Sequence, residues 1–218
     1  MKVKSNHFIG MKGTEEIKRS NGKKYTIRNH RHRYFFPDEW AAFYDQLKPK
    51  QKVTFHCLIN TGARINEVRN IKVSDIDFER RSIVLRITKT KDKQGNHKMR
   101  IIPISKQFTK YLKHLIKTKK LEHLDNIPIL STPAANIGMK KALKEANIND
   151  WEMFSVHTVR KTLETWLISL DIDSLKIVKH FGHTMNIAAQ HYVSPDTFSW
   201  DDKGLMRNII GDLYQKRY

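Results

Sequence analysis

The sequence predicts a mainly α-helical chain with one small antiparallel β-sheet, which is an α+β fold. Two observations lead to this expectation. Apolar residues recur at helical spacing through most of the chain beyond residue 35. Residues 76–104 break that pattern, because they are rich in β-branched side chains and are divided by a polar loop at Gln94, Gly95 and Asn96.

Three parts are expected along the 218 residues. Residues 1–34 are rich in Lys, Arg, Asn and Gly and show little apolar periodicity, so they are expected to form a basic arm or linker. Residues 35–200 are long and apolar enough for a single globular domain. Residues 201–218 hold a C-terminal amphipathic helix with the apolar stripe Leu205, Ile209, Ile210 and Leu213.

The first helix of the domain is expected at Pro37 and Asp38, which suit a first helical turn. Gly62 and Gly182 are expected to end two further helices, and Ser105 is expected to cap a third. The helices expected after the first cover residues 52–60, 64–70, 105–118, 134–147, 156–170, 173–181, 186–193 and 203–215.

The chain is strongly basic, since subtracting 22 acidic from 41 basic residues leaves a charge of +19. Such a charge predicts a polyanionic partner, and double-stranded DNA is favoured over a membrane surface. In the arm, Arg28, Arg31 and Arg33 are expected either to be solvated or to lie along a phosphate backbone.

No apolar run approaches the roughly 20 residues of a bilayer span, and residues 1–20 lack a signal-peptide hydrophobic stretch. The single Cys57 can form no internal disulfide, which agrees with a reducing compartment. A cytoplasmic, nucleoid-associated location is therefore expected. The apolar stretch VTFHCLI around Cys57 favours a core position over a thiol nucleophile.

Four polar residues stand out in the segment FSVHTVRKTLETWLISLDIDSLKIVKHFGHTMNIAAQHYV, residues 154–193. His157 and Arg160 are three residues apart, so a helix places them on one face. His183 follows the helix end at Gly182, and Tyr192 follows nine residues later. Each of them alone has a simpler structural explanation, as a core histidine, a salt-bridge partner or a buried aromatic residue.

Three earlier residues make this set more informative. Arg64 follows the glycine turn in TGARINEV, and Glu67 lies one helical step on, where it can hold the guanidinium in place. Lys89 lies near the hairpin loop, where a long side chain could reach a site. No acidic cluster that could bind a metal ion accompanies these residues.

A phosphodiester would use every member of this set. Two guanidinium groups can clamp its non-bridging oxygens and stabilise the charge of a pentacoordinate transition state. A tyrosine with a pKa near 10 is only about 0.1% ionised at neutral pH, so it needs positive charge and a base nearby in order to attack phosphorus. A lysine could protonate the departing sugar oxygen, and the chemistry needs neither metal nor nucleotide cofactor.

TGARINEV, Lys89 in the hairpin, HTVR, GHT and Tyr192 together resemble the tyrosine recombinase/integrase family. The intervals of 23 residues from Arg160 to His183 and nine from there to Tyr192 are similar to the spacing in that family. The resemblance covers residues 35–195 and implies that residues 35–200 form the catalytic domain. The catalytic residues that it implies are Arg64, Lys89, His157, Arg160, His183 and the nucleophile Tyr192.

This family resemblance also implies a mechanism and an assembly. Tyr192 would form a 3′-phosphotyrosyl link to one DNA strand, without metal or ATP, and a 5′-hydroxyl from a partner duplex would reverse the step. Four protomers would act on two duplexes, and the free protein would be a monomer or dimer. The C-terminal helix is expected to dock on a neighbouring protomer in such an assembly.

The chain departs from the family pattern in two places. A separate helical core-binding domain usually precedes the catalytic domain, so the chain is expected to be either a compact integrase or a fragment. Lys161 stands where a second His is common, and it is expected to add a phosphate contact. Lys91 is the alternative to Lys89 as general acid, and Lys91 and Lys93 are otherwise expected to contact the DNA backbone.

Three other interpretations of the sequence stay open at this point. A type IB topoisomerase would use the same chemistry to relax supercoiled DNA. A helix-turn-helix repressor would explain the positive charge without any catalysis. A metal site could be built from His180, His183 and His191, although no Asp, Glu or Cys lies at a supporting spacing.

Overall fold

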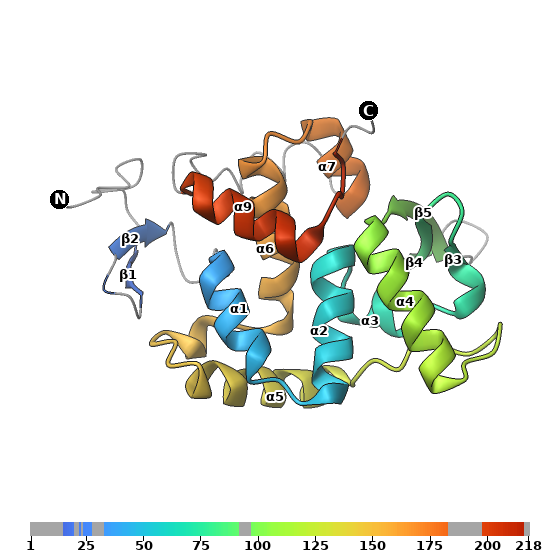
Figure 1. Ribbon diagram of the computed structural model, residues 1–218, viewed down its shortest axis with the longest axis horizontal. Helices are drawn as coiled ribbons and strands as arrows, with labels where there is room; N and C mark the ends of the chain where they lie inside the picture. Colours follow the sequence, from blue (N-terminus) through green and yellow to red (C-terminus); the bar gives the residue numbers. More distant parts are fainter. Residues whose placement is uncertain are drawn as a thin grey trace.

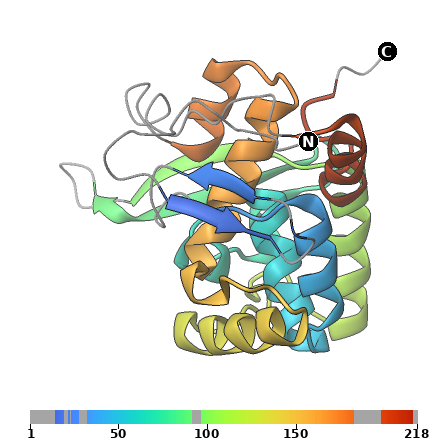
Figure 2. The same cartoon turned by 90° about the vertical axis from the view of Figure 1, so that its left-hand side faces the viewer.

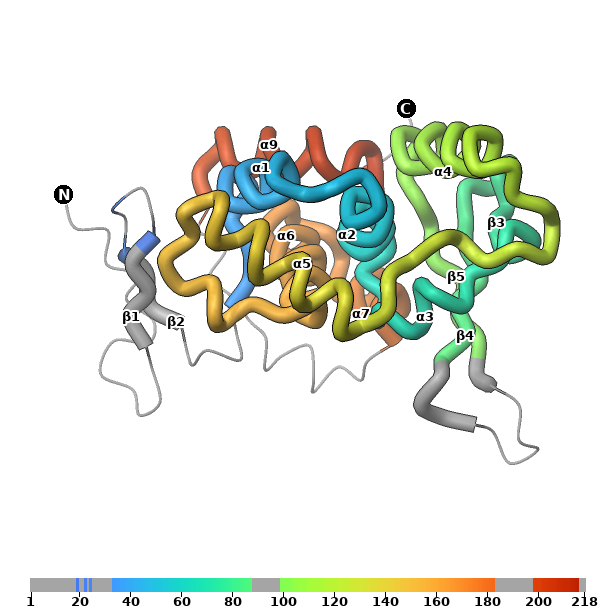
Figure 3. The backbone as a smooth tube through the Cα atoms, turned by 90° about the horizontal axis from the view of Figure 1, so that it is seen from below, coloured from blue at the N-terminus to red at the C-terminus, as the bar shows by residue number. Residues whose placement is uncertain are grey.

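The computed structural model describes residues 15–19, 22, 24–27, 33–91, 97–182 and 198–215 (Figure 1). It confirms the expected fold class, with helices around one small antiparallel sheet. The β1–β2 hairpin and the three-stranded sheet lie at opposite ends of the molecule (Figures 1 and 3). In the described part of the chain, no helix has the length and apolar character that crossing a membrane requires.

The first two helices begin at prolines. The α1 helix, Pro37–Asp45, starts where the sequence predicts, because Pro37 occupies the first helical turn and the Glu39 carboxylate accepts the Phe36 N–H at 3.0 Å. The α2 helix, Pro49–Thr61, starts three residues before the expected position for the same reason. It ends at Gly62, whose φ of 56° lies in the left-handed region.

The sheet has strand order β3-β4-β5, with β3 at Ile76–Asp77, β4 at Ser82–Lys91 and β5 at His97–Pro103. Both pairings are antiparallel, so the expected hairpin is present and a short third strand is added. Along β5, Met99 and Ile101 are exposed, whereas Arg100 and Ile102 face inward. The inward side of β5 therefore carries a charged residue toward the helices.

The remaining helices enclose the core. Figure 2 shows α5, Thr132–Glu145, running beneath α1 and α2. The central helix α6, Val156–Ser169, packs on α2, α5 and α7 and buries Trp166 and Leu163 completely. Helix α4, Lys106–Lys119, is capped as expected by Ser105, and helix α7, Ser174–Phe181, ends at Gly182, whose φ is 64°.

The N-terminal segment differs from the simple arm that composition predicts. Strands β1, Glu15–Lys18, and β2, Lys24–Ile27, form an antiparallel hairpin. The β2 sequence KYTI alternates polar and apolar residues, but four residues are the shortest run that can indicate a strand. Arg19, which follows β1, is buried and forms ion pairs with Asp38 and Glu39 of α1.

Arg33 is not at the surface where a phosphate contact was expected. Its guanidinium is buried and pairs with Glu39 at 2.8 Å and Asp150 at 2.6 Å. The expectation was wrong because the sequence does not show that these two carboxylates, far apart along the chain, meet at one position. Arg28 and Arg31 lie outside the described residues.

The last helix, α9, is Trp200–Ile210, and it packs on α1 and α6 of its own chain. Met206, Ile210 and the following Leu213 are buried, whereas Leu205 is 41% exposed. The apolar stripe is thus rotated from the expected one, since Met206 occupies the core position that had been assigned to Leu205. Docking of this helix on a neighbouring protomer stays a prediction.

Candidate active site

The first part of the site is the turn between α2 and α3, where α3 is Ile65–Arg69. Glu67 lies in the first turn of α3 and accepts the backbone N–H of Arg64 at 3.1 Å and its Nη1 at 3.0 Å. The expected pairing of Glu67 with Arg64 is therefore present. The Glu67 side chain is 0% exposed and that of Arg64 is 36% exposed. The buried carboxylate therefore holds a guanidinium that is partly open to solvent.

Arg160 reaches the same turn from α6, 96 residues further along the chain (160 minus 64). Its Nη1 donates to the Gly62 carbonyl at 2.8 Å, and its Nη2 donates to the Phe181 carbonyl at 2.5 Å. These contacts place the Arg160 guanidinium between the turn before Arg64 and the end of α7. The structure thus brings together the two arginines that the sequence singled out.

A third arginine, Arg100 of β5, joins the cluster and was missed at the sequence level. Its Nη2 donates to Glu67 Oε2 at 2.7 Å, and its Nε donates to the His180 carbonyl at 3.0 Å. The only sequence signal was a charged residue in the β-rich run KMRIIPI. Apolar residues flank Arg100 on both sides, so the alternation does not tell which side of the strand is buried.

The three guanidinium groups surround one carboxylate. Within Arg64, Glu67, Arg100 and Arg160 the formal charge is +2, three positive minus one negative. Burial, together with the charges of Arg64 and Arg100, lowers the pKa of Arg160 to about 10, although Glu67 and Glu164 oppose the decrease. Such a cluster is stabilised when an anion binds, because the anion offsets the repulsion.

Glu67 remains ionised in this environment. Burial raises its pKa, but the hydrogen bond and the charge of Arg100, together with the hydrogen bonds from Arg64, outweigh burial and hold the pKa below its ordinary value. Glu164 of α6 behaves differently. Burial raises its pKa to about 7, although Arg160 and Lys161 oppose that shift.

His180 lies at the end of α7 and has both ring nitrogens engaged. Nε2 contacts the Thr61 carbonyl at 2.9 Å and so carries the proton, while Nδ1 accepts from the Tyr214 hydroxyl at 2.9 Å. Burial lowers the pKa of His180 to about 3, and Arg100 and Arg160 contribute to the decrease. In this position His180 is a neutral structural residue, which removes it from the metal site considered with His183 and His191.

The other expected site residues are placed as follows. His157 is exposed in the first turn of α6, and Lys161 is half-buried on the same helix. Lys89 and Lys91 belong to β4, where Lys91 pairs with His97 at the end of the hairpin. Three residues lie outside the described part of the chain, and these are Lys93, His183 and Tyr192.

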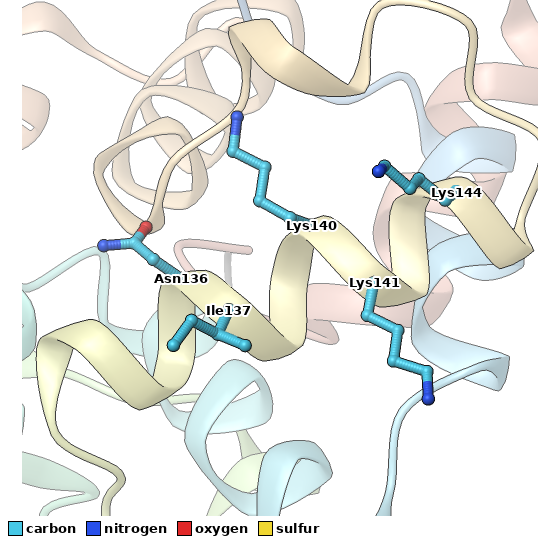
Figure 4. Close-up of a pocket in the computed structure, with 5 residues that line it drawn as sticks. All are labelled: Asn136, Ile137, Lys140, Lys141 and Lys144. Atoms are coloured by element: carbon cyan, nitrogen blue, oxygen red, sulfur yellow. The ribbon is translucent and has the colours of Figure 1, made fainter.

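A group of lysines on α5, not singled out by the sequence, lies beside the start of α6. A pocket there is lined by Asn136, Ile137, Lys140, Lys141 and Lys144 (Figure 4). Asn136 accepts the Val156 N–H at 3.0 Å, which fixes this face of α5 next to the residue before His157. Lys140 donates to the carbonyls of Trp151 and Glu152, and Lys144 lies 3.9 Å from the centre of the Trp151 ring.

Comparison with known proteins identifies the family of this chain. A model of the phage integrase family matches residues 33–197. A probable integrase/recombinase of Acholeplasma phage L2 is 34% identical over 134 residues, covering 58% of this chain and 43% of that protein. The tyrosine recombinase XerA of Pyrococcus horikoshii is 26% identical over 160 residues, covering 68% of this chain and 51% of the relative. The chain thus spans about half the length of these curated relatives.

Solved structures share the fold. The crystal structure of XerA recombinase aligns with a TM-score of 0.58 and 20% identity, covering 85% of this chain and 65% of that one. A lambda integrase dimer bound to a COC′ core site aligns with a TM-score of 0.55 and 18% identity, covering 77% of this chain and 61% of that one. The catalytic domain of bacteriophage HP1 integrase aligns with a TM-score of 0.52 and 15% identity, covering 72% of this chain and 85% of that one.

Proposed function

The chain belongs to the phage integrase family, and from this premise we propose that it cleaves and rejoins double-stranded DNA through a covalent 3′-phosphotyrosyl intermediate on Tyr192. The proposal includes the site-specific recombination that the family name suggests. Its closest chemical alternative is DNA relaxation by a type IB topoisomerase, which would show no sequence preference.

One observation carries the proposal. Arg64, just before α3, and Arg160 of α6 meet at the Gly62 turn, where Arg160 Nη1 donates to the Gly62 carbonyl at 2.8 Å. Glu67 orients Arg64 from the buried side at 3.0 Å. A pair of guanidinium groups held in this way suits the non-bridging oxygens of a phosphodiester and the charge that grows on them in the transition state.

The reaction then balances with the residues of this chain alone. The Tyr192 phenol oxygen attacks phosphorus and loses its proton to His157, the proposed base. The bond from phosphorus to the 5′ oxygen breaks, and Lys89 gives that oxygen a proton. His183 is proposed to donate a further hydrogen bond to the phosphate. A 5′-hydroxyl attacks the phosphotyrosine in the reverse step, so the number of ester bonds is conserved.

Positive charge beyond the arginine cluster supports binding of DNA. The chain carries a formal charge of +19, and the α5 lysines lie beside the start of the helix that holds His157. Lysines at such a position can pair with phosphates that flank the reacting one. We propose a tetramer on two duplexes, a monomer or dimer without DNA, and contacts from Lys91, Lys93, Lys161, Arg28 and Arg31 to the backbone.

A covalent-trapping experiment tests the proposal. The protein is incubated with a nicked suicide substrate and denatured, and a DNA-linked band is sought on a gel. Tyr192→Phe should abolish the band, whereas Tyr111→Phe, a matched loss of a hydroxyl on α4, should keep it. A band that persists in Tyr192→Phe makes the assigned nucleophile wrong, and Tyr214 or Tyr218 would be tested next.

Two further arms separate the alternatives. EDTA should leave the covalent band unchanged, because no step uses a metal ion. A repressor would bind DNA without forming a band. A topoisomerase would relax supercoiled plasmids of any sequence, whereas a recombinase joins strands only between plasmids that carry its site.

A further inference from the structure

The last turn of α7 is held from outside the helix by arginines. The final carbonyls of a helix have no partner within the helix and need one from elsewhere. The His180 carbonyl accepts from Arg100 Nε at 3.0 Å, and the Phe181 carbonyl accepts from Arg160 Nη2 at 2.5 Å. Cations also suit the negative end of a helix dipole. The turn at Gly182 then leads directly to His183.

Arg100 binds a second element with the other edge of its guanidinium. Its Nη2 contacts Glu67 Oε2 at 2.7 Å, and the other oxygen of Glu67 holds Arg64 at 3.0 Å. The Arg100 and Glu67 side chains are 8% and 0% exposed. One guanidinium therefore joins the carboxylate that orients Arg64 to the helix end that Arg160 also binds.

The hydrogen bonds of Arg100 leave one part of its guanidinium unsatisfied. Arg100 Nη1 is buried and finds no hydrogen-bond partner among the described residues. Burial of a charged group with an unmet donor is unfavourable, and apolar residues in place of a whole buried ion pair are often as stable or more so. Stability alone therefore does not require an ion pair here. The Arg100 Cδ lies 3.5 Å from the position that a Cβ on Gly182 would take, so the side chain fits closely against the turn.

We propose that Arg100 is a positioning residue, which fixes the end of α7 and, through Glu67, the side chain of Arg64, so that Arg64 and Arg160 reach one phosphate together. The proposal rests on the proposed function and adds a residue to its machinery. Arg100 acts through Glu67 and the His180 carbonyl, without touching the DNA.

The test compares Arg100→Met and Arg100→Lys with the unaltered protein in single-turnover cleavage of the suicide substrate at saturating DNA. A misplacement near 1 Å can slow an enzyme about a hundredfold, and a loss of this order is expected for Arg100→Met. Arg100→Lys should give an intermediate rate, because one ammonium cannot span both acceptors in the fixed geometry of a guanidinium. Affinity for DNA should keep its salt dependence, whereas a lost phosphate contact would reduce the slope by about 0.9.

Arg86→Met is the matched control. Arg86 makes a two-pronged ion pair with Asp75 at the same sheet, and neither residue contacts the arginine cluster in the described structure. Its loss should leave the cleavage rate unchanged. A double variant of Arg100→Met with Glu67→Gln should be no slower than Glu67→Gln alone, because both changes break one linkage.

The pH profile supplies a readout that general loss of structure would not move. The charged groups facing Glu67 are Arg64 from the start of α3, Arg100 from β5 and Arg160 from α6. Arg100 is the main group that lowers the Glu67 pKa, so Arg100→Met should move the acidic limb of the rate profile to higher pH. Arg86→Met should leave that limb in place.

Hydrogen exchange of the free protein tests the linkage without any DNA chemistry. Amides at the end of α7 should exchange faster in Arg100→Met than in the unaltered protein. Their exchange rates should not change in Arg86→Met. A normal cleavage rate in Arg100→Met, additive effects with Glu67→Gln or a reduced salt slope would each overturn the proposal. Failure of the proposed function is distinct, since it shows as no Tyr192-dependent band in the unaltered protein. Faster exchange without slower cleavage would reduce Arg100 to a purely structural role.

Discussion

Glu67→Gln is expected to lower the stability of the fold strongly. It removes the carboxylate but keeps the side-chain volume, and it leaves three guanidinium groups without their shared partner. Arg100 is 8% exposed, so its pair with Glu67 counts as buried, whereas Arg64 is 36% exposed and solvent screens its pair. Breaking a buried pair by removing one partner costs about 3–5 kcal/mol, and the Arg64 pair adds about 1 kcal/mol at most.

Urea denaturation followed by circular dichroism measures this loss. A domain of this kind has a free energy of unfolding of about 5–15 kcal/mol. Glu67→Gln should therefore strongly lower the urea concentration at the unfolding midpoint, while the dependence of the free energy on urea concentration stays the same. Glu67→Asp keeps the charge on a shorter side chain and should lose less, which keeps the test useful if Glu67→Gln fails to fold. Asp75→Asn is the control, because its partner Arg86 is 37% exposed and the expected loss is smaller.

The loss should also depend on pH in a defined direction. The Glu67 pKa is lowered in the folded protein, so the stabilisation by its charge is present above the unfolded value, roughly 4.3, and disappears as pH falls through the folded value. The free energies of unfolding of the unaltered protein and of Glu67→Gln should therefore show their full difference at neutral pH and become equal in acid. A loss under about 1 kcal/mol at pH 7, or a difference independent of pH down to the acid limit, would refute the assignment of Glu67 as the anchor of the cluster.

Three further outcomes are expected. Gly62→Ala should lower the midpoint of thermal unfolding by the equivalent of more than about 1 kcal/mol, because φ is 56° and a Cβ would meet the Phe181 ring at 2.6 Å; unchanged melting would contradict the left-handed turn. Glu164→Gln should make stability in urea less dependent on pH, since a folded pKa raised to about 7 means that the natural residue loses stability as pH rises from its unfolded value toward 7; identical pH profiles would argue against a buried carboxyl there. The paired change Lys141→Gln and Lys144→Gln should reduce the salt slope of DNA binding by up to about 1.8, and an unchanged slope would place DNA elsewhere.

Local residue chemistry was sufficient for much of the fold and for part of the site. Pro37, Gly62, Ser105 and Gly182 mark helix ends at the expected places, because proline, glycine and serine act on the backbone within a turn of their own position. The pairing of Arg64 with Glu67 follows from the same short range, since the two residues are three apart.

Contacts between distant segments required the tertiary structure. Arg33 looks like the other basic residues of its segment, yet Glu39 and Asp150 hold it in the core. Arg100 looks like one more charge on a basic hairpin, yet Glu67 and the His180 carbonyl bind both edges of its guanidinium. The sequence around an arginine does not show which role its side chain has. The carboxylates and carbonyls that folding places around the guanidinium decide whether it binds the protein or stays available to bind an anion.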